Sequence, residues 1–202
     1  MFPQLTDLVA MLGIDLVLCA GCMRLLSWKA VTQTSAKWVT VAFFVALWFP
    51  VGAAHLPVLA YIRGISSDLS ITLLMLAFVG LCHRFLGTPA VAVRERSAVF
   101  IAVAAAALFL YPLALGWGNW DSYRPGWGSA GMWAILLMVS LFCWFKGLRL
   151  LPALVALALL AWTAGIMESG NLWDYLIDPW LVLWALSFVF LKCARRLFKA
   201  AS

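Results

Sequence analysis

The sequence predicts an all-α polytopic membrane protein, a bundle of about seven transmembrane helices formed by one domain over residues 1–202. Its composition is 66% hydrophobic and only 11% charged, with a mean hydropathy of +1.02. Soluble domains are about 45–50% apolar and about 25% charged. Long apolar runs recur along the chain, and basic residues gather between alternate runs. These observations leave no stretch polar enough for a separate soluble module.

Seven apolar segments are long enough to span a bilayer, for which about 20 residues are needed. They cover approximately residues 6–26, 38–62, 68–86, 97–116, 128–146, 149–167 and 179–195. Pro50 and Pro57 predict that the second segment is kinked or broken in its outer half. The N-terminal sequence lacks a basic n-region, so we expect the first segment to be retained as a span.

The basic residues predict the orientation of the spans. The connections 24–37, 84–96 and 146–149 and the tail 192–199 hold Arg24, Lys29, Lys37, Arg84, Arg94, Arg96, Lys146, Arg149, Lys192, Arg195, Arg196 and Lys199, twelve of the 14 basic residues. The positive-inside rule makes this side cytoplasmic, with the N-terminus outside. We therefore expect a multi-pass protein of the cell inner membrane. Its expected partner is membrane lipid, with a further membrane subunit or a homo-oligomer as alternatives and no nucleic acid.

The outer loops carry the two remaining basic residues, Arg63 and Arg124. Because they oppose the charge rule, each needs a carboxylate partner or an anionic ligand. Arg63 would pair with Asp68 or with the acids of residues 168–178. Alternatively, both guanidinium groups would grip a phosphate or carboxylate in bidentate fashion. The candidate ligand-binding residues are Arg63, Arg124, Asp68, Asp121, Trp120, Trp173, Tyr123, Tyr175 and His55.

The segment 168–180, ESGNLWDYLIDPW, concentrates acids between two apolar runs. A short helix over 170–178 would place Asn171, Asp174 and Asp178 on one polar face. Trp173, Ile177 and Trp180 would then point toward the headgroups. Two carboxylates one turn apart suit a divalent cation or an acid–base pair, which makes Asp174, Asp178 and Glu168 the catalytic candidates. Alternatively, these acids are solvated or cap the seventh helix.

Two other polar features lie near the membrane segments. Ser66, Ser67 and Asp68 are candidate N-caps for the third helix. Asp15 lies near the middle of the first span, where an ionisable side chain is costly and often functional. We expect it to bond a hydroxyl such as Ser140, Thr163 or Ser187, or to serve proton relay or ion coupling.

The loop sequence WGNWDSYRPGW resembles the extracytoplasmic tryptophan–aspartate motif of haem-handling membrane proteins. It lacks the run of adjacent tryptophans, and His55 is its one outer histidine where that family pairs two. Gly126, Gly128 and Gly131 spell GxGxxG, but no strand precedes them, so the dinucleotide-binding interpretation fails. The cysteines lie in apolar segments, and no metal or cofactor is assigned.

Together these patterns favour a protein that binds or presents an amphipathic anionic envelope ligand, such as a phospholipid or lipid-linked sugar. It would act as an accessory subunit of an envelope-biogenesis or export assembly. A small ion-coupled transporter using Asp15, a carboxylate-dependent enzyme, a haem-handling protein and a purely structural subunit are the alternatives. Whether the protein is an enzyme is left open.

Overall fold

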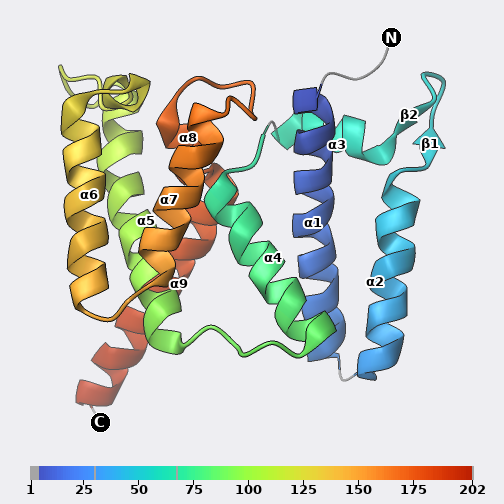
Figure 1. The fold of residues 1–202 in the computed structure, drawn as a ribbon. Helices are drawn as coiled ribbons and strands as arrows, with labels where there is room; N and C mark the ends of the chain where they lie inside the picture. Colours follow the sequence, from blue (N-terminus) through green and yellow to red (C-terminus); the bar gives the residue numbers. More distant parts are fainter. Residues whose placement is uncertain (1–4, 30, 67, 202) are drawn as a thin grey trace. The chain divides into compact units, whose positions relative to one another are not determined.

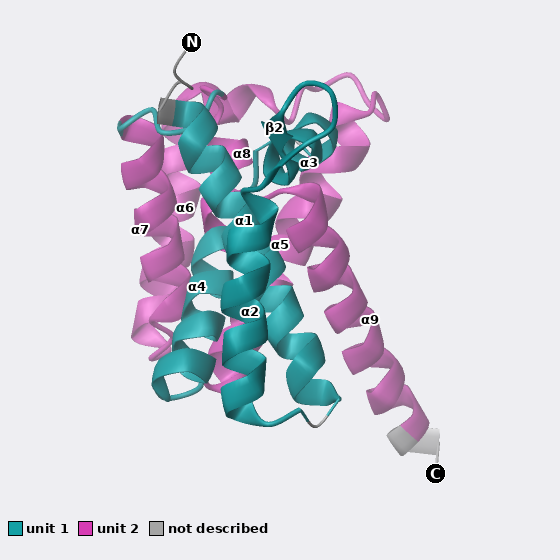
Figure 2. Cartoon of the chain, turned by 90° about the vertical axis from the view of Figure 1, so that its right-hand side faces the viewer, with its two compact units in different colours: residues 1–69, 73–90, 164–168 teal, residues 70–72, 91–163, 169–202 magenta. Residues whose placement is uncertain are grey.

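The computed structural model describes residues 5–29, 31–66 and 68–201, and it confirms the all-α class. It is about 75% helical, with nine α-helices within the described residues (Figure 1). The chain forms two compact units, shown in different colours in Figure 2. The first unit comprises residues 1–69, 73–90 and 164–168, and the second comprises residues 70–72, 91–163 and 169–202.

The first unit is built from the N-terminal helices. It contains α1 (Leu5–Trp28), α2 (Gln33–Leu47), β1 (Pro50–Val51), β2 (Leu56–Pro57), α3 (Val58–Ser66) and most of α4 (Ile71–Leu86). α1 packs against both α2 and α3. Ile14 and Met23 of α1 and Leu59 of α3 are almost completely buried, so they form part of the core of this unit.

The predicted second span is broken, as its prolines indicate. α2 ends at Leu47, because Pro50 disfavours helix in the residue before it and has no N–H to donate. A short antiparallel hairpin follows, in which Pro50 pairs with Pro57. His55 adopts a positive φ of 49° in its turn. The predicted segment 38–62 is therefore divided into the helix α2, a hairpin and the separate helix α3.

Side chains of α2 hold the C-terminal end of α4. Gln33 Nε2 donates to the Arg84 carbonyl at 3.0 Å, and Lys37 Nζ donates to the Phe85 carbonyl at 2.8 Å. The last carbonyls of a helix have no partner within it and attract cations. Gly87, with φ 71°, then ends the helix in the left-handed conformation.

The second unit contains the remaining helices. These are α5 (Val93–Ala114), the 3₁₀ helix η1 (Arg124–Trp127), α6 (Ala130–Phe145), α7 (Leu150–Thr163), α8 (Leu172–Leu176) and α9 (Pro179–Ala201). α5 packs against α9 and α7. At the α5–α9 contact, the Phe100 ring lies 5.1 Å from Trp184 and 5.0 Å from Phe188, measured between ring centroids. Phe100 is therefore a central side chain of this core.

Local capping interactions define the ends of α6 and α7. The Ser129 hydroxyl accepts a hydrogen bond from Met132 N at the start of α6. Gly147, with φ 72°, ends that helix. The Glu95 carboxylate of α5 accepts hydrogen bonds from the backbone N–H groups of Arg149 and Leu150, at 2.8 and 3.0 Å. This acid is thereby placed at the positive end of α7.

Each of the seven predicted segments contains a helix, but the helices differ in length. By length and composition, two helices of the described chain could cross a membrane, Thr6–Trp28 and Val93–Ala114. α4, α6 and α7 are apolar but shorter. α6 nearly matches its predicted span 128–146, whereas α7 ends at Thr163, before the predicted 167 and shortly before Gly165, which has a positive φ of 61°.

Candidate functional site

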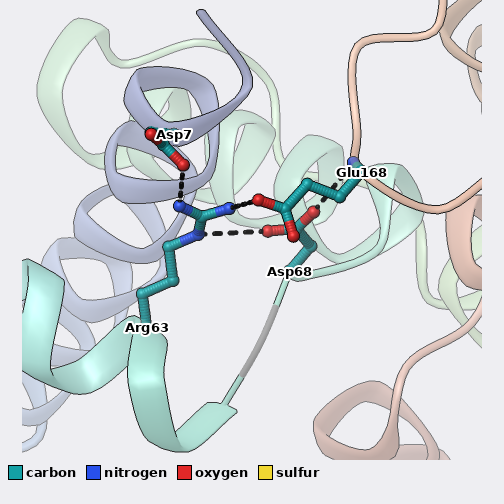
Figure 3. A network of polar contacts seen from close by, with 4 residues as sticks. All are labelled: Asp7, Arg63, Asp68 and Glu168. Carbon is teal, nitrogen blue, oxygen red and sulfur yellow. Dashed lines mark hydrogen bonds and ion pairs between the residues drawn. The ribbon is translucent and has the colours of Figure 1, made fainter. Parts of the chain in front are cut away.

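Arg63 is the centre of a charged cluster in the first unit (Figure 3). It lies in the last turn of α3 and faces Asp7 from the first turn of α1. Its Nη1 donates to Asp7, and its Nη2 donates to Glu168 Oε1 at 2.5 Å. Its Nε lies 3.5 Å from Asp68 Oδ1, and Glu168 N donates to Asp68 Oδ2 at 3.2 Å. The pairing of Arg63 with Asp68 and with an acid of the segment 168–178 is confirmed.

Three carboxylates therefore neutralise one guanidinium group. The side chains of Arg63 and Asp68 are 18% and 12% exposed, whereas Glu168 is 62% exposed. Burial alone would lower the pKa of Arg63, but hydrogen bonds to Asp7 and Glu168 and the charges of Glu168 and Asp68 outweigh it. The pKa consequently lies above its ordinary value. An arginine that is already matched to three acids is poorly suited to an incoming anion.

The acids of the 168–180 segment do not form the predicted polar face. α8 covers only Leu172–Leu176, so Asp178 lies beyond its end and Asn171 is its N-cap. Trp173 and Ile177 are buried instead of pointing outward. Tyr175, a predicted ligand-binding residue, is completely buried as well. The helix is too short to align three polar positions, and its apolar side chains pack inside the second unit.

Asp174 is held by two hydroxyl groups. Tyr123 Oη donates to Asp174 Oδ2 at 2.5 Å, and Ser169 Oγ donates to the same oxygen. Burial raises the pKa of Tyr123, and the hydrogen bond and charge of Asp174 raise it further, partly offset by Ser169. Tyr123 is therefore a neutral donor at physiological pH, and Asp174 is a structural acceptor.

A second set of bonds attaches α8 to the loop before η1. Trp173 Nε1 donates to the Ser122 carbonyl at 3.1 Å, and Asn171 Nδ2 donates to the Tyr123 carbonyl at 3.1 Å. The Asn171 side chain also caps α8 by accepting from Trp173 N at 2.9 Å. Gly126 faces this contact, because a Cβ there would lie only 1.9 Å from Asn171 Oδ1.

Asp178 caps α9 and also binds Ser70 within the second unit. Its Oδ1 accepts from Leu181 N at 2.9 Å in the first turn of α9. Its Oδ2 accepts from Ser70 N at 3.1 Å and from the Ser70 hydroxyl at 2.5 Å, just before α4 begins. The alternative in which an acid of this segment caps the seventh helix is confirmed.

The third helix is not capped as predicted. Ser66 is the last residue of α3, and the Asp68 carboxylate is engaged with Arg63 and Glu168 N. Ser67 lies outside the described residues. Ser70, directly before Ile71, occupies the capping position instead.

Metal binding by these acids finds no geometric support. Among residues 5–29, 31–66 and 68–201, no group of three or more His, Cys, Asp or Glu side chains is arranged to hold a metal ion. Asp174 and Asp178 each accept hydrogen bonds from separate sets of donors. A shared divalent cation or an acid–base pair is therefore not favoured by this arrangement.

Arg124 differs from Arg63. It is exposed at the start of η1, and its guanidinium group has no hydrogen bond or ion pair with any described residue. Asp121 does not pair with its side chain but accepts from the backbone N–H groups of Tyr123 and Arg124, at 2.9 and 3.2 Å. Trp127 is exposed in the same turn. Side chains at i and i+3 of a 3₁₀ helix lie on the same side, so Arg124 and Trp127 share one face.

Trp120 extends the aromatic surface of this loop. It is exposed, and its ring lies 5.5 Å from that of Phe109 in α5, measured between centroids. His55, in contrast, lies exposed in the hairpin turn of the first unit. Of the predicted ligand-binding residues, Trp120, Asp121 and Arg124 are thus exposed within one loop, whereas Trp173 and Tyr175 are buried.

Asp15 is completely buried in α1 of the first unit. Trp48 Nε1 donates to its Oδ2 at 2.7 Å, and Cys19 Sγ donates to its Oδ1 at 3.4 Å. The predicted hydroxyl partners are wrong for two of the three residues, because Thr163 and Ser187 donate to carbonyls of their own helices. The indole of Trp48 was not predicted as the partner.

Sequence reasoning also missed Asp7 and Ser169. Asp7 lies in the first turn of α1. The predicted orientation places the start of this helix on the same side as Arg63, so the position of Asp7 was a usable signal. Ser169 precedes the Asn171 cap and gave no comparable signal.

Comparison of the chain with protein-family models, with curated proteins and with solved structures finds no match.

Proposed function

We propose that this is a multi-pass inner-membrane protein with seven spans in one transmembrane domain, its N-terminus outside and its C-terminus cytoplasmic. Support comes from the apolar composition and from the helices that coincide with the predicted segments. Large apolar side chains are also exposed along α2 and α6, including Trp38, Phe44, Ile135, Met138 and Phe142. Soluble monomers rarely expose contiguous apolar surface on this scale.

The proposed activity is the binding of an amphipathic anionic ligand at the outer end of the second unit. The observation that supports it best is the exposed Arg124 guanidinium on the same face as the exposed Trp127 indole. Arginine recognises phosphate through paired hydrogen bonds. Tryptophan prefers the boundary between headgroups and acyl chains. A phospholipid or a lipid-linked sugar phosphate combines the two chemistries.

The proposed ligand site contains fewer residues than the sequence predicted, because Arg124 belongs to it and Arg63 does not. Arg63 becomes a structural residue, because Asp7, Asp68 and Glu168 already neutralise it. Asp121 supports the site by fixing the turn that carries Arg124. Presentation of the bound amphiphile to other subunits of an envelope-biogenesis or export assembly is the proposed biological role.

Native mass spectrometry of the full chain in mild detergent tests this proposal. The probes are phosphatidylglycerol, undecaprenyl phosphate and zwitterionic phosphatidylcholine. Arg124→Gln should lower retention of the anionic probes at least about tenfold, since a charge-assisted hydrogen bond contributes about 1.5–3 kcal/mol. If Arg124→Gln loses only one of the two anionic probes, that probe shows whether the site binds a phospholipid or a lipid-linked sugar phosphate.

Arg149→Gln is the matched control for this experiment. Arg149 is also exposed beside a tryptophan, 5.4 Å from the Trp144 ring, but it lies at the α6–α7 turn. Retention should stay near wild type in this variant. Equal loss in both variants, or no loss in Arg124→Gln, contradicts a site at Arg124.

Ion-coupled transport through Asp15 is the second candidate, and a specific observation favours it. Asp15 is a completely buried acid, with both oxygens hydrogen-bonded. Ionisable groups inside membrane segments are typical of proton and ion pathways. Proteoliposomes containing a pH-sensitive dye test this function directly. A transporter would carry a proton flux that Asp15→Asn abolishes, and an absence of flux in the wild type excludes it.

The enzyme and haem alternatives have less support. Asp174 and Asp178 serve as hydrogen-bond acceptors for hydroxyl and backbone groups. The carboxyl of Glu168 is bound to Arg63. His55 lies in a hairpin turn of the first unit. None of these side chains has the environment expected of a general acid, a general base or an axial ligand.

A further inference from the structure

The C-terminal part of α9, residues 190–198, is amphipathic. At about 100° per residue, Lys192, Arg195 and Arg196 fall within one sector of the helix. Phe190 and Leu197 fall on the opposite side. The three basic side chains of the segment therefore share one face, Phe190 and Leu197 lie opposite to it, and Phe198 lies on the flank between the two. We call the segment the basic end of α9.

The basic end of α9 is not packed against its own unit. Leu181 and Ala185, in the first half of α9, are completely buried. Phe190, Leu197 and Phe198 are 72%, 72% and 77% exposed. In both Figure 1 and Figure 2, this end of α9 extends beyond the lower ends of the other helices of its unit. The apolar face is therefore available to an external partner.

The charge of the basic end is uncompensated along its helix. The sequence of α9, Pro179–Ala201, contains no Asp or Glu. Arg195 and Arg196 are exposed, and Lys192 Nζ lies 5.7 Å from the Phe188 ring centroid. An exposed surface with a positive face beside a phenylalanine- and leucine-rich face matches the boundary of a bilayer that contains anionic lipid.

We propose that the basic end of α9 binds an anionic phospholipid bilayer surface. The helix crosses the boundary obliquely, with Phe190, Leu197 and Phe198 among acyl chains. Lys192, Arg195 and Arg196 extend to the phosphate groups, as long basic side chains do at this depth. This surface is separate from Arg124, and it would act in addition to the ligand site at η1.

Limited trypsin digestion in nanodiscs tests the proposal, because trypsin cleaves after Lys192, Arg195 and Arg196. The full chain is compared in phosphatidylcholine alone and in equal parts of phosphatidylcholine and phosphatidylglycerol. Each basic residue near an anionic surface should strengthen binding roughly fivefold. Cleavage in the wild type should therefore be at least fivefold slower in the anionic bilayer, and high salt should remove most of this protection.

Three variants separate the contributions. Leu197→Ser/Phe198→Ser keeps every basic residue and should be cleaved faster than wild type in the anionic bilayer. Arg195→Gln/Arg196→Gln keeps Lys192, so its protection in the anionic bilayer should fall severalfold but should not vanish. Arg195→Lys/Arg196→Lys should retain the full protection. Equal cleavage of the wild type in the two bilayers overturns the proposal. So does lipid-independent protection accompanied by a crosslinked dimer, which would identify a second copy as the occupant. Ligand retention at Arg124 is measured separately, so either proposal can fail alone.

Discussion

Trp48 donates its indole N–H to the Asp15 carboxyl group at 2.7 Å, joining the end of α2 to the middle of α1. A buried polar group that loses its partner costs about 1–3 kcal/mol. Trp48→Phe removes the donor but keeps an aromatic ring, so we expect the free energy of unfolding to fall by about 1–3 kcal/mol. Unfolding in mixed micelles, followed by far-ultraviolet circular dichroism, measures this change.

Two further variants make this prediction specific. Asp15→Asn keeps an oxygen that accepts from Trp48, so its loss of stability should be smaller than that of Asp15→Ala. Trp180→Phe changes an exposed tryptophan and serves as the matched control. Equal effects of Trp48→Phe and Trp180→Phe would mean that the indole–carboxyl bond contributes no measurable stability.

Arg63→Gln should destabilise the first unit. The substitution leaves Asp7, Asp68 and Glu168 without their shared cation. The expected loss lies between about 1 kcal/mol, for an exposed ion pair, and about 3–5 kcal/mol, for a fully buried one. Glu168→Gln should cost less because this carboxylate is mostly exposed. The unfolding free energies of the variants are compared at low and high salt.

A double variant tests whether charge imbalance causes this loss. Arg63→Gln/Asp68→Asn should recover part of the stability, since it removes the least exposed of the uncompensated carboxylates. Arg124→Gln is the control, because Arg124 is exposed and has no partner among the described side chains. If the two arginine variants unfold alike, the cluster does not stabilise the unit.

The sequence was informative about Arg63 because a basic residue on the predicted outer side requires compensation. That argument predicted Asp68 and an acid of the 168–178 segment as partners, and the ion pairs confirm both. The same argument treated Arg124 as equivalent. Arg124 differs from Arg63, because Asp121, the acid nearest to Arg124 in sequence, accepts hydrogen bonds from backbone N–H groups and not from the Arg124 side chain.

Other features depended on chain geometry that composition does not contain. Hydropathy predicted where helices lie, but glycine turns and Pro50 determine where they end. The partner of Asp15 depends on the packing of α2 against α1, which places Trp48, the C-cap of α2, beside Asp15. Trp173 was predicted to face the headgroups because α8 was expected to be longer. In a five-residue helix it turns inward and bonds to Ser122.

Tyr123 should make stability fall at alkaline pH. Burial and Asp174 raise its pKa above the ordinary value of 10.0 in the folded protein. Between the two pKa values the folded state binds more protons than the unfolded state, so stability decreases as pH rises. This contribution is fully present below about pH 10 and is lost above it. Tyr123→Phe should remove this part of the pH dependence, measured as unfolding free energy from pH 7 upward.

Asp174→Asn is the control for the cause of this effect. It keeps the phenol but removes the neighbouring negative charge, which raises the pKa of Tyr123 together with burial. The alkaline decrease in stability should therefore become smaller but should not disappear. An unchanged pH profile in both variants would exclude Tyr123 as its source.

Gly126 should not tolerate a side chain. A Cβ at this position would lie 1.9 Å from Asn171 Oδ1 and 2.7 Å from Trp173 Cδ1, and both atoms belong to the contact that fastens α8 to the η1 loop. Forcing extra atoms into a well-packed contact typically costs about 1–3 kcal/mol. Gly126→Ala should therefore lower the free energy of unfolding by about 1–3 kcal/mol or more and accelerate hydrogen exchange in α8.

Gly131→Ala is the matched control, since nothing lies within 4 Å of a Cβ built at this position and alanine favours the helix. It should be neutral or stabilising, and a similar loss in both variants would show that the α8 contact is not the cause.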